Sequence, residues 1–81
     1  MSWQINKIIN VANQLQRTGR TGASMGERIA AAFVLNQMDY LPGSYRDTVE
    51  AWDRLGEEWQ GYVKIIKRDH MHLVEAGNEI D

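Results

Sequence analysis

The sequence predicts an all-α fold, a small single-domain bundle of four helices. Apolar residues recur every three or four positions through most of the chain, which is the spacing of one helix face. Gly19, Gly22, Pro42, Gly43 and Gly56 fall between these periodic stretches. The length of 81 residues supports one domain, residues 1–81. The predicted helices span residues 3–17, 24–38, 46–55 and 57–74, and residues 75–81 are expected to form a frayed tail.

The stretch 24–38 is predicted to be the central helix. It opens with Ser24-x-x-Glu27, the capping-box pattern, in which each side chain accepts a hydrogen bond from the other residue's backbone amide. Three alanines, Ala30–Ala32, lie at its middle and favour a helix. Apolar side chains surround this helix on most of its circumference, which is typical of a helix buried among others.

The stretch 3–17 is predicted to be an amphipathic helix. Ser2 is a candidate N-cap and Gly19 a candidate C-cap. Trp3 and Val11 lie away from the main stripe, and packing at the edge of a neighbouring helix is favoured over a second contact for a partner. The main apolar stripe consists of Ile5, Ile8, Ile9, Ala12 and Leu15.

The segment 17–23, Arg-Thr-Gly-Arg-Thr-Gly-Ala, carries two interpretations. Its glycines, arginines and hydroxyls lie just before a helix N-terminus, a combination that can hold a phosphate or carboxylate. The segment lacks the Lys-Ser/Thr pair of a P-loop, and no strand precedes it. We therefore favour a connector between two helices, in which the glycines supply left-handed conformations.

Pro42-Gly43 marks a break after the central helix, and Tyr40 and Leu41 are expected to fold back onto the core. The short helix 46–55 has two overlapping start signals, Ser44-x-x-Asp47 and Asp47-x-x-Glu50. Its end is predicted at Gly56, where glycine supplies a stop.

The stretch 57–74 is predicted to be the last and longest helix. Acidic residues at its start and cations further along suit the helix dipole, the cations being Lys64, Lys67 and Arg68. Its long stripe consists of Trp59, Tyr62, Val63, Ile66, His70 and Leu73.

Composition excludes several classes of protein. The chain has no cysteine, so disulfide scaffolds, thiolate metal sites and cysteine nucleophiles are excluded. Its net charge of −2 is typical neither of a polybasic nucleic-acid binder nor of a strongly acidic mimic of DNA. No apolar run is long enough to span a membrane, and the first residues lack the pattern of a signal peptide, so we expect a cytoplasmic location and no membrane partner.

Residues 69–75 carry the strongest metal-like pattern. On a regular helix Asp69, His72 and Glu75 share one face, whereas His70 points elsewhere, so one helix offers at most one histidine and two carboxylates. We therefore expect no metal and no cofactor. We also expect no enzyme, because Ser24 is better explained as a cap than as a nucleophile, and no Gly-x-Ser-x-Gly elbow exists.

The class that remains is a non-enzymatic protein-binding module, with a homodimer as one form of it. Tryptophan, tyrosine, methionine and arginine are enriched at the centres of interfaces, and the aromatic residues here are spread over several helices. The candidate partner-binding residues are Trp3, Tyr40, Tyr45, Trp52 and Trp59.

The alternative is a nucleic-acid-associated accessory protein. Arg17, Arg20 and Arg28 cluster around the first loop and are the candidate contacts to an anion or to nucleic acid. The second helix is the most apolar of the four, so it does not suit the reading helix of a helix-turn-helix.

Short segments along residues 21–68 also resemble a known pattern: Thr21-Gly22-x-Ser24, Ala32-Phe33-Val34-Leu35, Gly43, Asp47, Trp52-Asp53 and Ile65-Ile66-x-Arg68. In these segments the chain resembles a family of small uncharacterised helical proteins encoded on proteobacterial plasmids, integrative elements and phages. That family tends to carry tryptophan after the Phe-Val-Leu segment, where this chain has Asn36 and Gln37. The resemblance implies a mobile-element or phage accessory protein that binds a host or viral protein, including defence complexes, and it supplies no catalytic residue.

Overall fold

The computed structural model describes residues 2–43 and 47–74, and within them the fold is all-helical and forms one small domain. The three α-helices are α1 (Trp3–Thr18), α2 (Met25–Leu35) and α3 (Thr48–Ile65). Three short elements accompany them: the 3-10 turn η1 (Met38–Tyr40), the π-helical turn η2 (Ile66–His70) and the 3-10 turn η3 (Met71–Leu73). The all-α prediction is confirmed, and the predicted frayed tail lies outside the described residues.

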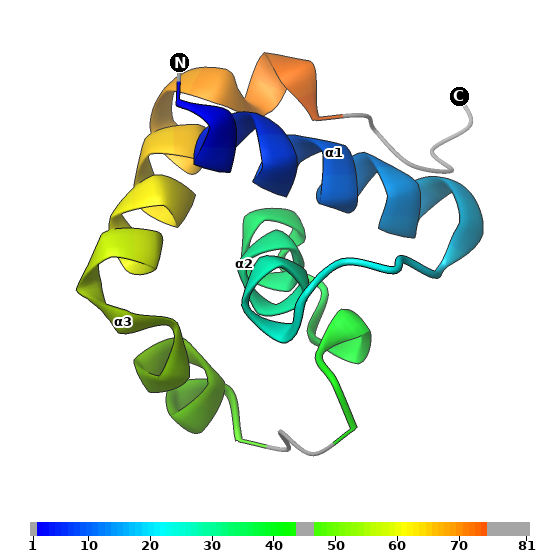
Figure 1. The fold of residues 1–81 in the computed structure, drawn as a ribbon, viewed down its shortest axis with the longest axis vertical. Coiled ribbons are helices and arrows are strands. Elements are labelled where there is room, and N and C mark those ends of the chain that lie inside the picture. Colours follow the sequence, from blue (N-terminus) through cyan, green and yellow to red (C-terminus); the bar gives the residue numbers. More distant parts are fainter. Residues whose placement is uncertain (1, 44–46, 75–81) are drawn as a thin grey trace.

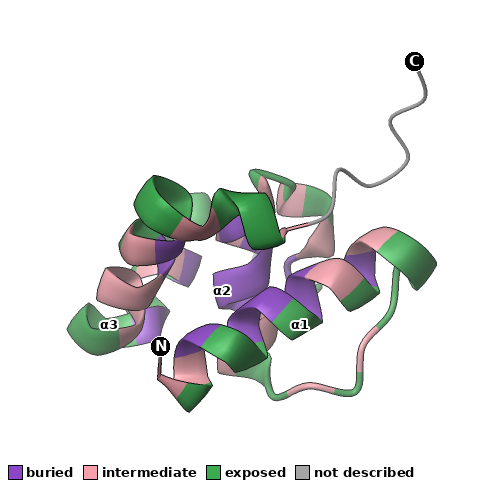
Figure 2. Cartoon of the chain, turned by 90° about the horizontal axis from the view of Figure 1, so that it is seen from above, coloured by how far each residue is buried: buried purple, intermediate pink, exposed green. Residues whose placement is uncertain are grey.

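Helix α2 occupies the centre of the domain, as predicted. Figure 1 shows α2 end-on, with α1 passing across it and α3 running down its other side. The side chains Ile29, Ala30, Ala31 and Ala32 are fully buried, because α1, α3 and η1 all pack against this helix. In Figure 2 the buried residues, drawn in purple, are found mainly on α2 and on the side of α1 that faces it. The small alanines allow the backbones of its neighbours to come close.

Both predicted caps of α1 are confirmed. The Ser2 hydroxyl accepts a hydrogen bond from the Ile5 amide at 3.3 Å. Gly19 takes a left-handed conformation, with φ of 75°, and its amide donates to the Leu15 carbonyl at 2.7 Å. Val11 is only 1% exposed and packs with Ala31 of α2, so this side chain belongs to the core rather than to its edge.

Helix α2 ends at Leu35, three residues earlier than the predicted end at residue 38. Asn36 adopts a left-handed conformation, with φ of 56°, which ends the α-helical hydrogen bonding. The amide of Gln37 donates to the Ala32 carbonyl at 3.0 Å, and the amide of Asn36 donates to the Phe33 carbonyl at 3.2 Å. This pair of bonds is a Schellman motif, and asparagine is one of the few residues that accept the conformation it needs.

The predicted helices 46–55 and 57–74 correspond to the two segments of α3 and the turns that follow it. Asp47 is the N-cap and accepts a hydrogen bond from the Val49 amide at 2.9 Å, so the second of the two start signals is used. Gly56 has φ of 82° and ψ of 163°, which are not helical, so it ends the first segment of α3 as predicted, and a kink joins that segment to the second. The side chain of Gln60 spans the kink and donates to the Trp52 carbonyl at 2.7 Å.

The regular helix predicted up to residue 74 stops at Ile65. A π-helical turn follows, and then a 3-10 turn that the Val74 amide closes onto the Met71 carbonyl at 3.0 Å. Because the turns no longer have the α-helical period, Leu73 leaves the predicted apolar stripe and is 40% exposed. The Asn13 side chain of α1 donates to the Leu73 carbonyl at 3.2 Å and ties this end of the chain to α1.

The kink at Gly56 generates a test of the fold. The conformation of Gly56 is one that residues with a side chain scarcely adopt, so Gly56→Ala is expected to lower the free energy of unfolding by roughly 1–3 kcal/mol. The matched control is Gly61→Ala, also in α3, where the added methyl group has open space and no positive φ. That change is expected to stabilise by about 0.5–1 kcal/mol in urea denaturation. If both changes alter the free energy of unfolding by the same amount, the positive φ assigned to Gly56 is contradicted.

Candidate functional site

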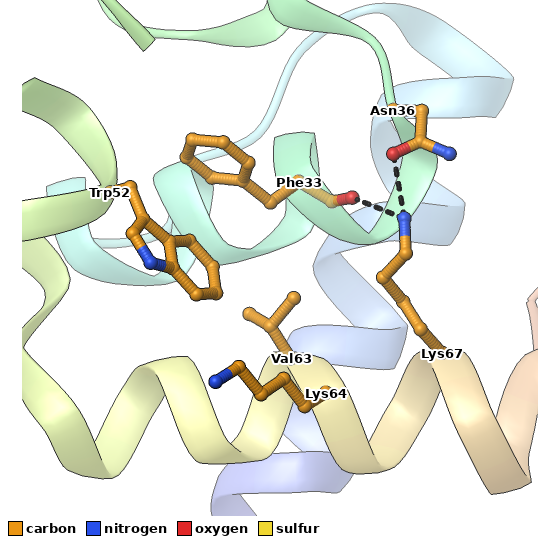
Figure 3. Close-up of a pocket in the computed structure, with 6 residues that line it drawn as sticks. All are labelled: Phe33, Asn36, Trp52, Val63, Lys64 and Lys67. Atoms are coloured by element: carbon orange, nitrogen blue, oxygen red, sulfur yellow. Dashed lines mark hydrogen bonds between the residues drawn. The ribbon is translucent and has the colours of Figure 1, made fainter. Parts of the chain in front are cut away.

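An open hollow of about 280 Å³ lies where the C-terminal end of α2 meets α3 and η2 (Figure 3). The hollow lies between the two segments of α3 on either side of the Gly56 kink, since Trp52 precedes the kink and Val63 follows it. The lining residues are Phe33, Asn36, Trp52, Val63, Lys64 and Lys67. The hollow is thus built by the end of the central helix and by the bend in the helix after it.

The floor of the hollow is apolar. The rings of Phe33 and Trp52 meet edge to face, with centroids 5.1 Å apart and an interplanar angle of 67°. This geometry brings the positive edge of one ring to the negative face of the other. Both rings are half-buried, and the Val63 side chain beside them is buried in the core. The floor therefore joins the hydrophobic core to a surface that solvent reaches.

Lys67 forms one side of the rim and is bonded to the end of α2. Its ammonium donates to the Asn36 side-chain oxygen at 2.6 Å and to the Phe33 carbonyl at 3.2 Å (Figure 3). The carbonyl groups at a helix C-terminus carry partial negative charge, so a cation there stabilises the helix. The role of Lys67 in the fold is therefore to cap α2 from a distant part of the chain.

Lys64 forms the other side of the rim and differs from Lys67 in its contacts. Its side chain is exposed, and among the described residues it takes part in no hydrogen bond or ion pair. In Figure 3 the two lysines point in different directions, Lys67 toward Asn36 and Lys64 toward the side of the hollow where Trp52 lies. Lys64 therefore holds a positive charge beside an apolar floor and is available to an incoming group.

The predicted partner-binding residues that the structure describes, four of the five, do not gather at one site. Among these four, Trp52 alone lines the hollow. Trp3 is 66% exposed at the start of α1, whereas Tyr40 and Trp59 are half-buried and pack against the core. Tyr45 lies outside the described residues.

Trp59 is held within its own helix. Its ring meets that of Tyr62 edge to face at 5.7 Å, and the Tyr62 hydroxyl donates to the Glu58 carboxylate at 3.0 Å. This hydrogen bond is the main cause that raises the pKa of Tyr62 above its usual value of 10.0, with burial and the charge of Glu58 adding to it. The raised pKa follows from a local contact on the surface of α3, and none of these three residues lines the hollow.

The three arginines of the predicted anion site have different surroundings. The Arg28 side chain donates from Nε to the Tyr40 carbonyl at 2.9 Å and so supports the turn η1. Arg17 and Arg20 are exposed at the end of α1 and in the loop that follows. Arg28 therefore has a structural role, and it is less exposed than Arg17 and Arg20.

The Arg-Thr-Gly segment has the contacts of a connector. The Thr21 hydroxyl donates to the Gln14 side-chain oxygen at 2.7 Å and accepts a hydrogen bond from the Ala23 amide at 3.2 Å. The Thr18 hydroxyl accepts a hydrogen bond from the Arg20 amide at 3.2 Å. Only Gly19 of the two glycines in this segment has a positive φ, so the prediction that both glycines supply left-handed conformations is wrong for Gly22. The predicted capping box follows the segment, with the Ser24 amide donating to the Glu27 carboxylate at 3.0 Å and the Glu27 amide donating to the Ser24 hydroxyl at 3.3 Å.

The histidine pair has a geometry that a regular helix does not produce. The rings of His70 and His72 have centroids 6.3 Å apart, because the chain changes from a π-helical to a 3-10 turn between them. The part of the chain described by the structure contains no cluster of three or more residues suited to hold a metal ion. Glu75, the third member of the predicted face, lies outside that part.

The sequence indicates Trp52 as a candidate contact but does not indicate the hollow around it. From the sequence, Phe33 belongs to the apolar surface of the central helix and Val63 to the stripe of the last helix. The helix dipole alone accounts for the two lysines. One local signal was available, because an asparagine directly after an apolar helical run predicts a left-handed C-cap at Asn36. The approach of Lys67 to that cap depends on the path of α3 beyond Gly56, which no local pattern specifies.

No family model, curated protein or solved structure matches the chain. The resemblance to small proteins of plasmids, integrative elements and phages therefore stays a prediction. In the described part of the chain, no helix has both the length and the apolar character needed to cross a membrane.

The two lysines of the rim allow a matched test of the geometry. Lys67→Met removes a cap of α2 and is expected to lower the free energy of unfolding by roughly 0.5–1.5 kcal/mol. Lys64→Met, three residues earlier, is expected to change it by less than about 0.5 kcal/mol, because Lys64 makes no such contact. Thermal and urea unfolding of both variants measure the difference. A larger loss for Lys64→Met would contradict the assigned contacts.

Proposed function

We propose that the chain is a non-enzymatic protein-binding module that receives its partner in the hollow at the end of α2. The observation that carries the proposal is the open apolar floor, in which the half-buried rings of Phe33 and Trp52 remain within reach of a ligand. Aromatic side chains in such positions supply much of the binding energy of protein interfaces, because a partner removes a large apolar area from water.

The size of the hollow supports a protein partner over a small-molecule substrate. Sites for small ligands usually enclose about 300–1,000 Å³ and cover most of the ligand. The hollow here, about 280 Å³ and open to solvent, suits one anchoring side chain. Val49 is 65% exposed and lies one turn before Trp52 on α3, so an apolar strip continues beyond the hollow.

The lining also supports a binding role over a catalytic one. The six lining residues include two lysines as the only titratable groups, and Lys67 is bonded to the end of α2. General acid–base or nucleophilic chemistry needs a base or nucleophile held by a second group that orients it. Lys64 has no such neighbour among the described residues.

The biological setting of the proposal comes from the resemblance in the sequence. The resemblance implies an accessory protein of a phage or mobile element, whose partner is a host or viral protein, including defence complexes. The cytoplasmic location proposed with it rests on the sequence, which lacks an apolar run long enough to span a membrane and the pattern of a signal peptide. Self-association is one form of the same role, because a second copy would also bury the apolar strip. The rival role, contact with nucleic acid through Arg17, Arg20 and Arg28, requires binding that falls steeply with salt.

Site-specific photo-crosslinking tests the proposal. The photoreactive residue p-benzoylphenylalanine replaces Val49, which is exposed on α3 one turn before Trp52, or, as the matched control, Lys7, which is exposed on α1; neither residue lines the hollow. After illumination in a lysate of proteobacterial cells, we expect a discrete protein adduct at position 49 that an excess of unmodified chain suppresses. Light scattering of the purified chain tells a foreign partner from a second copy.

Three results bear on the proposal. An adduct at position 49 and none at position 7 supports it. Equal labelling at the two positions, or no protein adduct at position 49, contradicts it. Binding of labelled oligonucleotides at low salt that is lost on changing Arg20 to Ala favours the rival role instead.

A further inference from the structure

Within the described residues, the positive charge of Lys64 at the rim of the hollow has no ion-pair partner. Lys67 differs, because its ammonium bonds to the Phe33 carbonyl and the Asn36 side-chain oxygen and meets the partial negative charge at the end of α2. Arg68, the next cation, pairs with Asp69 at 3.0 Å. Lys64 is therefore the lysine of the rim that a ligand can approach.

This arrangement is unfavourable for the chain alone. Lys64 and Lys67 lie three residues apart on neighbouring turns, and like charges at that spacing repel each other. The chain as a whole has 9 lysines and arginines against 11 aspartates and glutamates. The positive rim of the hollow is therefore opposite in sign to the net charge of the chain. A carboxylate brought by a ligand to Lys64 relieves this repulsion and gains a charged hydrogen bond.

The floor of the hollow indicates which group of the ligand would lie beside the carboxylate. Phe33, Trp52 and Val63 offer an apolar surface and no hydrogen-bond donor or acceptor aimed at a ligand, apart from the indole N–H group. The Asn36 side-chain oxygen, the polar acceptor of the lining, is already engaged by Lys67. The group that suits this floor is a single bulky apolar side chain.

A protein segment suits these two halves better than a nucleic acid does. Proteins that bind single-stranded nucleic acid follow the backbone with a continuous positive groove. Here the positive charge is confined to two neighbouring lysines on a chain of net charge −2, which repels a polyphosphate. A peptide can place one apolar side chain and one or two carboxylates within a few residues of each other.

We propose that the hollow binds an acidic peptide segment of the partner, with one bulky apolar side chain on Phe33 and Trp52 and a neighbouring carboxylate on Lys64. The inference rests on the proposed protein-binding function and adds the chemistry of the partner. Charge complementarity supports the inference, because Lys64, which has no ion-pair partner among the described residues, borders the apolar floor of the hollow.

A displayed library of random 12-residue peptides tests the inference on the full chain. Peptides are selected on the wild-type protein alone, with no selection against any variant. The enriched sequences are then synthesised with a fluorescent label and measured by anisotropy against the wild type, Lys64→Glu and the matched charge change Lys7→Glu. The folding of each variant is checked by circular dichroism.

The expected peptides combine a leucine, isoleucine, phenylalanine or tryptophan with aspartate or glutamate close by. Their binding is expected to weaken about fivefold or more in Lys64→Glu and less than twofold in Lys7→Glu. It is also expected to weaken when salt is raised, because the lysine charge lies at an exposed rim. Replacing the apolar residue of the peptide with alanine is expected to abolish binding.

The contrary results separate this inference from the proposed function. Enriched peptides that are neutral or basic, and that bind Lys64→Glu as well as the wild type, overturn the acidic partner and leave a protein-binding hollow. No enrichment overturns the inference, and the crosslinking at position 49, which leaves Lys64 in place, then decides the proposed function independently. If the wild type self-associates and Lys64→Glu does not, the hollow binds a second copy of the chain. If the wild type binds a single-stranded oligonucleotide and Lys64→Glu does not, the hollow binds nucleic acid. Either result overturns the inference.

Discussion

The burial of α2 on nearly all sides is the constraint on which the rest of the structure depends. Ile29 and the three alanines that follow it are fully buried, so α1 and α3 must both lie directly against this one helix. A helix of 11 residues has few turns of its own, and packing rather than helix propensity supplies most of its stability. The polar groups at its two ends then need partners close by, because burial removes them from water.

The groups that satisfy the two ends of α2 also determine where the candidate site forms. The capping box of Ser24 and Glu27 satisfies the start of α2 from within its own first turn. Its end is satisfied by the Schellman motif at Asn36 and by Lys67, which belongs to η2, directly after α3. The kink at Gly56 directs the second segment of α3 to that point, and Trp52 and Val63 come to lie on either side of the same hollow. The site is thus a consequence of how the end of a buried helix is capped.

Local patterns predicted the parts of the fold that local physics decides. The caps Ser2, Gly19 and Ser24 each depend on residues within one turn, and all three have the contacts that their patterns indicate. The central position of α2 followed from its apolar circumference. The early end at Asn36 and the π-helical turn after Ile65 were missed, since apolar spacing continued through both. The hollow was missed because its lining comes from segments up to 34 residues apart, as in the contact of Lys67 with the Phe33 carbonyl.

Native-state hydrogen exchange, followed by NMR, tests the central role of α2 most directly. If α2 is the core on which the other helices pack, its amides from Ala30 to Val34 exchange only through global unfolding. Their protection then equals the free energy of unfolding measured in urea, while amides of α3 before Gly56 exchange through smaller openings. Protection of α2 that falls well below the global value, or below that of α3 before Gly56, would contradict this account.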